Sequence, residues 1–431
     1  MWFRKRILFL VTLTIATSMT AHADETLKLS IEDARKYAVE HNRDLVNAGL
    51  AVSEAGERLR ETIAQGLPQV DAMVDYNNFF GSTATLGAMP GFEIEFNPTS
   101  NLQLSVGQMI FSGSYIVGVR SARLFKEVTE TTRERTGLEI RAQVTQAYYL
   151  ALISGQSFRL VEANLDNVKA IKEQTRAMVQ AGVAEEVDYD QLSVQVNMLE
   201  NALRAADRQV ELSYNMLRLQ MGLFADVPVT LTDDIDEIIG RSDFEGSLLA
   251  TFNISENLEY QLVDLQTNIA EQQVDMARAE YLPTITGFYN FTEKLLKPEF
   301  DITPNHVIGF NVSVPIFSSG VRQSRIRQAR INLDIAKNQK ALLSEQLSIQ
   351  EKQLRYNLNN AIEQYDSQKA NVEVSRRVYQ NITNKYRQGM ASSLDLTTAN
   401  NNYLQAENSY VSALMQLLEA HVAMEKLLNE I

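Results

Sequence analysis

The sequence contains no cysteine among its 431 residues. Disulfide bonds, thiolate metal sites and lipid attachment to a cysteine side chain are therefore excluded. Three of the four histidines, His41, His306 and His421, are widely separated and form no H-E-x-x-H motif. The sequence also lacks a glycine-rich phosphate loop and a G-x-S-x-G nucleophile motif. We predict that the protein is not an enzyme and binds no metal or cofactor.

Positive charge is also scarce. The chain has 40 Lys and Arg residues against 54 Asp and Glu residues, which gives a formal net charge of −14. An acidic chain of this kind argues against nucleic acid as a partner, because phosphate backbones are bound by clustered Lys and Arg. Beyond the N-terminal segment there is no run of about 18 apolar residues, so we predict no transmembrane helix.

The N-terminus has the three parts of a secretory signal peptide. A basic segment at residues 2–6 precedes a short, mostly apolar segment at residues 7–20, and Ala21-His22-Ala23 has the pattern of a cleavage site. We predict a signal peptide over residues 1–23, a mature chain that begins at Asp24, and export across an inner membrane.

Helix breakers are missing from one long stretch. Between Gly320 and Gly389 there is neither glycine nor proline, which leaves about 70 residues for one helix of roughly 100 Å. A seven-residue apolar repeat, typical of coiled-coil packing, runs along it at Leu358, Tyr365, Val372, Tyr379 and Tyr386. After Gly389 the pattern is helical again, so we expect a helix, a tight turn and a second helix.

The first half of the chain repeats this organisation. Gly113 and Gly182 are 69 positions apart, as are Gly320 and Gly389. Each first glycine follows an Ile-Phe-Ser sequence, and each second glycine is followed six positions later by an aspartate. We predict a duplicated unit of helix, strand, strand, long helix, turn and helix. Its boundaries are residues 24–224 for the first repeat, 225–255 for a linker or small irregular segment, and 256–431 for the second repeat.

Smaller features complete this organisation. Ser30 and Asp33 form a capping-box pattern, and an amphipathic helix is expected from there to about Gln65. Four segments alternate between apolar and polar residues, as strands do, at 70–76, 102–110, 285–291 and 308–316. A long loop is expected at about 78–100. The strand patterns fit outer-membrane barrel strands and an ordinary sandwich core equally well.

Four strands cannot close a barrel, since the smallest barrels have about eight. Because open strand edges are prohibitive in lipid, the membrane interpretation requires several chains, and three chains would supply about twelve strands. Without tryptophan in the mature chain, an interfacial aromatic belt would have to use Tyr76, Phe79, Phe80, Phe288, Tyr289 and Phe291.

The order and spacing of these motifs resemble the TolC-like outer-membrane efflux proteins over nearly the whole mature chain. The resemblance rests on the duplicated unit, on Ile316-Phe317 before Gly320, on the segment from Ala277 to Pro283, and on Tyr386-Arg-Gln-Gly389 followed by Leu394-Asp395. It implies a mainly α fold with a small β part. A homotrimer would form a 12-stranded transmembrane β-barrel above a coiled-coil-like helical tunnel that crosses the periplasm of a Gram-negative cell.

The resemblance also implies partners and site residues. The partners would be outer-membrane lipid, a periplasmic adaptor protein and an inner-membrane pump of the RND or ABC type. Asp188, Asp395 and Tyr386 match positions at the periplasmic aperture of the family. The sequence departs from the family pattern at Ala391, where the archetype has an arginine, and at Thr398, where it has a second aspartate. The cations that would replace the missing arginine are Arg176, Lys385 or Arg387.

Simpler interpretations stand beside these assignments. Asp188 and Asp395 also fit an ordinary helix N-terminus, and Tyr386 also fits core packing in the seam. The tip residues that would dock an adaptor, Gly182, Val183, Ala184, Gly389, Met390 and Ala391, also fit plain helix-ending turns. At the level of the molecule, the alternative to an export duct is a trimeric coiled-coil stalk or adhesin with a shared barrel. The sequence does not indicate the cargo.

Overall fold

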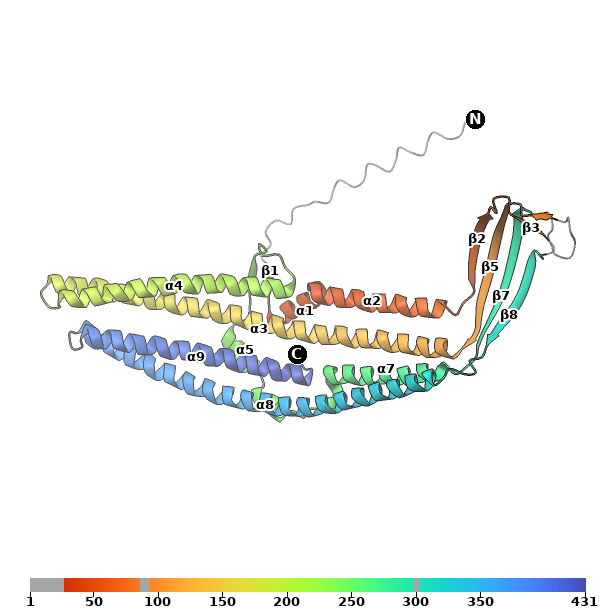
Figure 1. The fold of residues 1–431 in the computed structure, drawn as a ribbon. Helices are drawn as coiled ribbons and strands as arrows, with labels where there is room; N and C mark the ends of the chain where they lie inside the picture. Colours follow the sequence, from red (N-terminus) through yellow and green to blue (C-terminus); the bar gives the residue numbers. More distant parts are fainter. Residues whose placement is uncertain (1–26, 86–92, 298–302) are drawn as a thin grey trace, which may run out of the picture.

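The computed structural model describes residues 27–85, 93–297 and 303–431, so the predicted signal peptide at residues 1–23 lies outside the described residues. The molecule is a long helical bundle (Figure 1). A small sheet lies at one end, and the turns that join α3 to α4 and α8 to α9 lie at the other. This is the mainly α fold with a small β part that the sequence predicts. None of the described helices is both long and apolar enough to cross a membrane.

In the first half of the chain, two helices precede the strands β2 and β5 of the sheet and two helices follow them. In chain order they are β1 (Leu27–Leu29), α1 (Ile31–His41), α2 (Arg43–Ala64), β2 (Gln69–Asn77), β3 (Thr83–Thr85), β4 (Glu93–Glu95), β5 (Thr99–Ser112), α3 (Gly113–Gln180) and α4 (Glu186–Met221). A short connecting region follows, with β6 (Val229–Leu231), α5 (Ile235–Arg241), α6 (Phe244–Leu249) and the 3₁₀ turn η1 (Ile254–Glu256). The second half has α7 (Leu258–Ala279), β7 (Thr284–Leu296), β8 (His306–Ser313), α8 (Val321–Arg387) and α9 (Ser393–Leu428).

Corresponding helices of the two halves have nearly equal lengths. Helices α2 and α7 each have 22 residues, α3 and α8 have 68 and 67, and α4 and α9 each have 36. The uninterrupted heptad stretch therefore forms one helix, α8, and its counterpart forms α3. Matched positions in these two helices are 207 residues apart, as the two glycine pairs are.

The helix expected from Ser30 to about Gln65 is in fact two helices. Ser30 and Asp33 form the predicted capping box, but the chain leaves helical geometry at Asn42, where ψ is 130°. The Asn42 side chain then accepts hydrogen bonds from the Asp44 and Leu45 backbone amides and starts α2. An asparagine can end one helix by capping the next, which a periodicity pattern does not detect.

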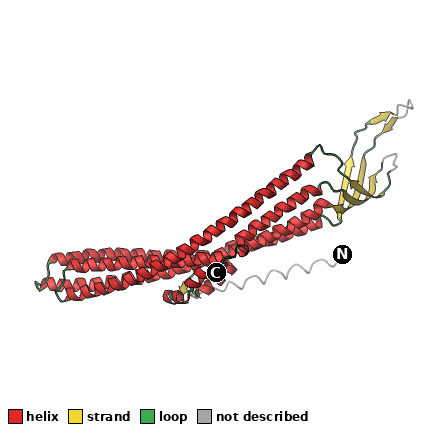
Figure 2. Cartoon of the chain, turned by 90° about the horizontal axis from the view of Figure 1, so that it is seen from below, coloured by secondary structure: helices red, strands yellow, loops and turns green. Residues whose placement is uncertain are grey.

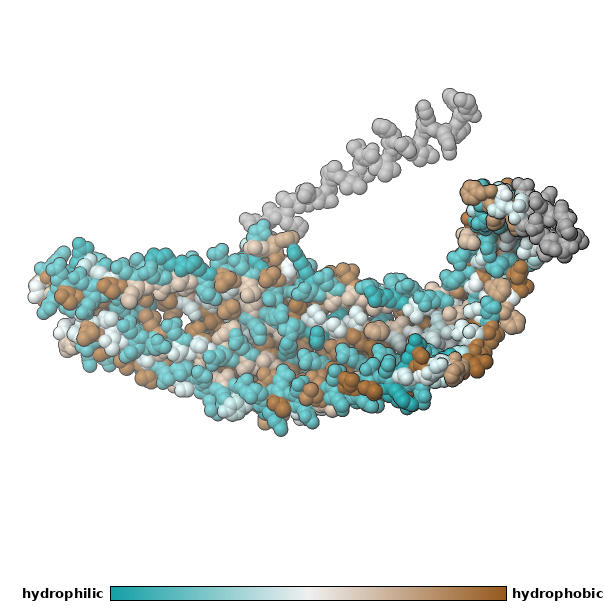
Figure 3. All heavy atoms as spheres, viewed as in Figure 1, coloured by the Kyte–Doolittle hydropathy of each residue, from teal (hydrophilic) through white to brown (hydrophobic). Residues whose placement is uncertain are grey.

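The four predicted strands form one antiparallel sheet in the order β2-β5-β7-β8. The register places Val70 beside Val106, Val106 beside Tyr289 and Tyr289 beside Ile308, so the apolar sets of all four strands share one face. Figure 3 shows hydrophobic residues gathered along the sheet and the turn from β8 into α8. The expected loop at 78–100 contains the short β3-β4 hairpin, and β5 begins earlier than expected, at Thr99.

The six candidate belt aromatics do not share one location. Tyr76, Tyr289 and Phe291 belong to strand positions on the apolar face. Phe288 is paired with Gly107 and Gly309 on the opposite, polar face, and its ring covers Gly309, where an added Cβ would come within 2.8 Å of it. Phe79 and Phe80 follow β2 in a turn. Phe288 therefore does not belong to the same aromatic surface as Tyr289.

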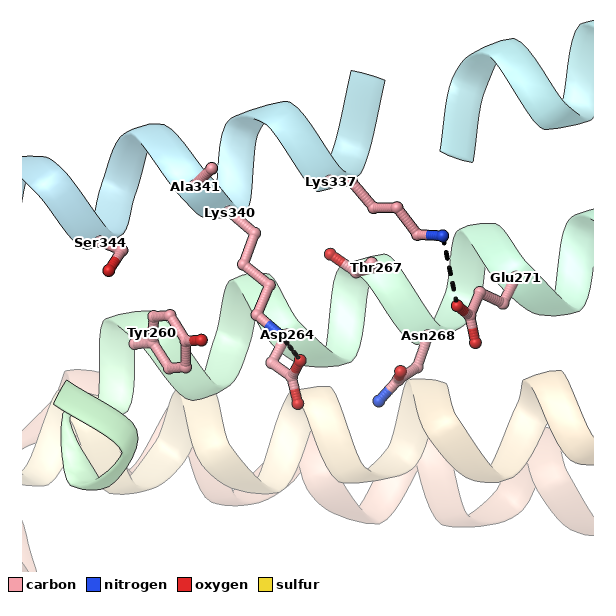
Figure 4. Close-up of a pocket in the computed structure, with 9 residues that line it drawn as sticks. All are labelled: Tyr260, Asp264, Thr267, Asn268, Glu271, Lys337, Lys340, Ala341 and Ser344. Carbon is pink, nitrogen blue, oxygen red and sulfur yellow. Dashed lines mark hydrogen bonds and ion pairs between the residues drawn. The ribbon is translucent and has the colours of Figure 1, made fainter. Parts of the chain in front are cut away.

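The bundle is held together differently along its length. Near its middle, a large apolar cluster joins α1, α3, α4, α8 and α9, and a second cluster joins α3, α4, α8 and α9 near the turns. Between α7 and α8 part of the contact is polar (Figure 4): Lys340 forms an ion pair with Asp264, and Lys337 lies 4.0 Å from Glu271. The shallow pocket there is bridged by these ion pairs. A small apolar cluster that includes Val274 and Ala329 joins the same two helices nearer the sheet. The described residues contain no group of His, Asp and Glu able to hold a metal.

Candidate functional site at the helical tips

The two helix-turn-helix ends have the same backbone structure. Gly182 and Gly389 both have φ of 73°, in the left-handed region that a side chain disfavours. The amide of Val183 donates to Met178 O (2.9 Å) and that of Met390 to Lys385 O (2.8 Å), the six-to-one bond of a Schellman motif. The predicted turns therefore occur where the two glycines interrupt the helical pattern.

Apolar side chains are exposed just beyond each turn. Val183 is 69% and Met390 is 65% exposed, and one turn further Val187 and Leu394 are 58% and 64% exposed. Ala184 and Ala391 are half-buried beside them. Each tip thus presents two matched apolar residues to solvent in the isolated chain.

The two matched aspartates both stand at the third position of a helix, but they have different partners. Asp395 accepts from the Ser392 hydroxyl (2.7 Å) and the Ser392 amide (3.0 Å), and these bonds hold the pKa of its exposed carboxyl below the usual value. Asp188 accepts from the Glu185 amide (3.2 Å) and also from the Ser393 hydroxyl of the other tip. Asp188 therefore connects the two helical hairpins, whereas Asp395 caps its own helix.

More side-chain contacts join the α3/α4 hairpin to the α8/α9 hairpin. The Ser393 hydroxyl also lies 2.9 Å from Gln191 Oε1, and the Thr397 hydroxyl lies 3.3 Å from Gln195 Oε1. Ser393 is only 3% exposed, so its hydroxyl is shielded from water by the two hairpins. Because these bonds cross between separate helical pairs, they would have to break if the hairpins moved apart.

Tyr386 lies between the long helices rather than on the surface. It is 4% exposed, packs in the apolar cluster near the tips, and its hydroxyl lies 2.7 Å from the Thr175 hydroxyl on α3. Burial raises the pKa of this phenol, so it stays protonated at neutral pH. The same side chain provides both core packing and a polar bond between the two long helices.

The three cations considered as substitutes for the missing arginine are exposed. Within the part of the chain that the structure describes, Arg176, Lys385 and Arg387 form no ion pair within 4 Å. Thr398 is exposed and its hydroxyl bonds back to Leu394 O (2.8 Å). Near the tips of one chain, the polar contacts between the hairpins are therefore made by hydroxyl, amide and carboxylate groups, and no described arginine takes part in them.

Sequence reasoning did not identify Thr175, Gln191, Gln195 or Ser393. Each has a common polar side chain at an unremarkable helical position, and its partner is more than 200 residues away in the chain. The one signal in the sequence that could have identified such a residue was position in the repeat, because Ser393 directly follows the residues of the turn between α8 and α9.

Comparisons with known proteins agree with this fold. The chain is 24% identical over 405 residues to the probable efflux pump outer membrane protein TtgC of Pseudomonas putida, covering 90% of this chain and 80% of that protein. It is 21% identical over 312 residues to the probable outer membrane lipoprotein SilC of Salmonella typhimurium, covering 68% and 62%. These relatives are named as efflux or outer-membrane proteins.

Solved structures show the same architecture. The outer membrane protein VceC of Vibrio cholerae matches with a TM-score of 0.74 at 17% identity, covering 92% of this chain and 95% of that one. The open state of the MtrE outer membrane channel of Neisseria gonorrhoeae matches with a TM-score of 0.73 at 16% identity, covering 92% and 88%. The family model described as outer membrane efflux protein matches residues 35–223 and 255–430. This chain belongs to the outer membrane efflux protein family.

Proposed function

We propose that three copies of this chain form a passive exit duct through the outer membrane and periplasm, opened at its tips by a periplasmic adaptor and an inner-membrane pump. The observation that carries the proposal is that the chain consists of two equivalent helical repeats, each of which has one exposed apolar side without a partner in the same chain. The predicted signal peptide, the two repeats at 24–224 and 256–431 and the connecting region at 225–255 are part of this proposal.

The unpartnered sides are seen by comparing matched positions of the two long helices. Ala142 and Tyr149 of α3 are buried, at 2% and 4% exposure, in the apolar cluster that α3 shares with α8 and α9 of the second repeat. Their counterparts on α8, Ile349 and Tyr356, are exposed at 68% and 64%. If every long helix is packed in the same way, the free face of α8 contacts the first repeat of another copy.

Both surfaces required for that contact are apolar stripes. On α8 the exposed residues repeat every seven positions at Ile335, Leu342, Ile349 and Tyr356. On α4 the exposed stripe is Met198, Ala205, Leu212 and Leu219. A seven-residue stripe predicts helix-to-helix packing, and neither stripe has a partner in the chain as described. Their contact would join copies head to tail and close a ring.

The sheet points to the same assembly. β2 and β8 are the edges of the four-stranded sheet, with unpaired backbone groups. Pairing the β8 edge of one copy with the β2 edge of the next removes every edge. Two copies would form a barrel of about eight strands, and side chains fill the interior of a barrel of that size. Three copies are therefore the smallest ring with an open bore.

The tips are the proposed adaptor-docking surface and aperture. Val183, Val187, Met390 and Leu394 supply exposed apolar contacts, while the bonds from Tyr386 and Ser393 hold the hairpins together until a partner binds. With no nucleotide-binding or catalytic motif, the energy for export would come from a pump of the RND or ABC type. The curated relatives include an antibiotic and a toluene efflux component, and cargo choice here is assigned to the pump.

A complementation experiment tests this function. In cells that lack this gene and redundant ducts, we expect greater sensitivity to exported toxins, restored by the wild-type chain. Replacing both Met390 and Leu394 by Asp should abolish restoration while trimers still form, because the docking surface becomes charged. Leu249→Asp, at an apolar residue that is 83% exposed away from the tips, is the matched control. Unchanged sensitivity and secretion after deletion would refute the duct.

A further inference from the structure

The exposed surface of α8 includes a stripe made only of amide side chains. Its members follow the alternating three- and four-residue spacing of one helical face: Gln346, Gln350, Gln353, Asn357, Asn360 and Gln364. All six are exposed, and Gln353 donates to Asn357 Oδ1 at 2.8 Å. Exposed helix faces usually carry charges, and other exposed faces of α8 do, so an uncharged stripe about 27 Å long requires an explanation.

The apolar residues of α8 show where this amide stripe lies in the helical wall of the proposed duct. Leu347 and Leu358, which are buried within the chain, each follow an amide by one residue. Ile349 and Tyr356, the exposed stripe assigned above to a second copy, each precede an amide by one residue. One residue is a rotation of about 100°, so the amides lie between the two lateral contacts of the helix. They must therefore face either the bore or the outside of a wall one layer thick.

The connecting region decides between these two directions. Ser348 and Arg355 each follow one amide by two residues and precede another by two, a rotation of about 200° to the opposite face. On that face Arg355 donates to Ala250 O (2.9 Å), and Ser348 lines a shallow groove together with Leu249 and Phe252. The short elements between α4 and α7 project from the side of the bundle near its middle (Figure 2). A segment that covers one face of the wall leaves the other face for the bore.

We infer that the amide stripe of α8 lines the bore and makes the middle of the duct indifferent to the charge of its cargo. Amides offer both hydrogen-bond donors and acceptors without a net charge, so they hydrate a wall without focusing a field on either sign of ion. The first repeat has glutamines at two of the six matched positions, Gln143 and Gln146. Of the other four, Leu150, Ile153 and Ser157 are uncharged, and Glu139 forms an ion pair with Lys426. The wall would pass anionic, cationic and neutral polar or amphiphilic molecules alike.

This inference rests on the proposed function and deepens it by naming the cargo class that the bore admits. Charge selection is then confined to the tips, where Asp395 is exposed, and to the pump. An acidic protein with a net charge of −14 would otherwise be expected to favour cations along its whole bore.

The absence of cysteine makes a direct test possible. Single-cysteine variants Gln350→Cys and Ser348→Cys are purified as full-length assemblies and placed in planar bilayers. Each is then treated with an anionic and with a cationic methanethiosulfonate reagent. At position 350 the anionic reagent should shift the reversal potential in a salt gradient towards cation selectivity, and the cationic reagent should shift it the opposite way. At position 348, on the outer face, neither reagent should cause a shift.

Each outcome has a distinct meaning. A cysteine at 350 that does not react in the assembly, or that reacts without a shift, would overturn the bore assignment, as would a shift at 348 alone. Strong cation selectivity that persists in a channel with Asp188→Asn and Asp395→Asn would overturn the neutral bore even if position 350 lines it. If the wild-type chain forms no channel at all, the proposed duct itself fails, which is a different result.

Discussion

The hydroxyl of Tyr386 provides one of the side-chain bonds between the two hairpins. Because the Thr175 hydroxyl donates to Ile171 O (3.0 Å), Tyr386 is the donor to Thr175. Tyr386→Phe keeps the ring in the core and removes about 0.5–1.5 kcal/mol per bond from the closed arrangement. We expect the open probability in single-channel recordings to rise by up to about tenfold for each bond that opening breaks.

Tyr379→Phe is the matched control for this prediction. Tyr379 is buried in the same apolar cluster, and its hydroxyl has no hydrogen-bond partner among the described residues. Removing that hydroxyl should leave the open probability unchanged. Equal effects of the two substitutions would show that the Tyr386 bond does not hold the tips closed.

Asp188 and Asp395 should have separable effects, because only Asp188 reaches the other hairpin. Asp395→Asn is expected to reduce cation selectivity, measured as the reversal potential, without raising the open probability. Asp188→Asn should change both, since it weakens the bond from Ser393. Identical behaviour of the two variants would contradict the different roles assigned to them.

The cap made by Asp395 also has a defined pH dependence. The pKa of Asp395 is lowered from 3.8 in the folded chain, first by its bond from the Ser392 hydroxyl and then by that from the Ser392 amide. The cap therefore contributes fully above pH 3.8 and is lost as the pH falls through the lower folded value. Hydrogen exchange of the first turn of α9 should be constant, after correction for intrinsic rates, between pH 5 and 8.

At the scale of single residues, the sequence predicted the features that depend only on neighbouring residues in the chain. The tip glycines and the matched aspartates were identified because turns and helix starts depend on a few neighbouring residues. The contacts of Thr175 and Ser393 were not identified, since they depend on how two helices separated by 200 residues approach each other. Phe288 illustrates the same limit: its aromatic type suggested the belt, whereas the register places it on the polar face.

Among the elements, Asn42 and Asn257 have equivalent positions and unequal bonds. Both cap a 22-residue helix, but the Asn42 amide group donates to Gln220 O at 2.7 Å, whereas that of Asn257 is 3.5 Å from Leu427 O. Asn42→Ala should lower the free energy of unfolding by about 1–2 kcal/mol, from the lost cap and the bond to α4.

The repeat supplies the control for this prediction. Asn257→Ala removes a cap of the same kind with a weaker second bond, so it should cost less, near the roughly 1 kcal/mol of the cap alone. Chemical denaturation in detergent, followed by far-UV circular dichroism, compares the two variants. A larger loss for Asn257→Ala would contradict the bond lengths as a guide to stability.

Long elements were predicted well because their patterns are long. α8 begins and ends within two residues of Gly320 and Gly389, since no other breaker lies between them and a heptad stripe runs through it. The break at Asn42 and the β3-β4 hairpin were missed, because each depends on a local cap or pairing within a segment too short to show a period.

At the scale of the whole molecule, a heptad stripe does not reveal whether its partner lies in the same chain. Leu358 and Ile349 both belong to seven-residue apolar repeats of α8, yet Leu358 is fully buried and Ile349 is 68% exposed. The sequence therefore predicted a coiled-coil-like helix without separating the seam within the chain from the seam between chains. The structure of one chain separates them, because only the first seam is covered.

This separation leads to a test of the assembly. Ile349→Arg places a charge on the exposed stripe, so the fold of the single chain should tolerate it within about 0.5 kcal/mol. In the proposed ring the same charge would be buried against α4 of the next copy, which costs several kcal/mol without a partner. We expect light scattering in detergent to show monomers for Ile349→Arg and trimers for Asp366→Arg, at an exposed residue that follows the amide Gln364 by two residues and therefore lies on the outer face. A trimeric Ile349→Arg protein with wild-type stability would show that this stripe is not the contact between copies.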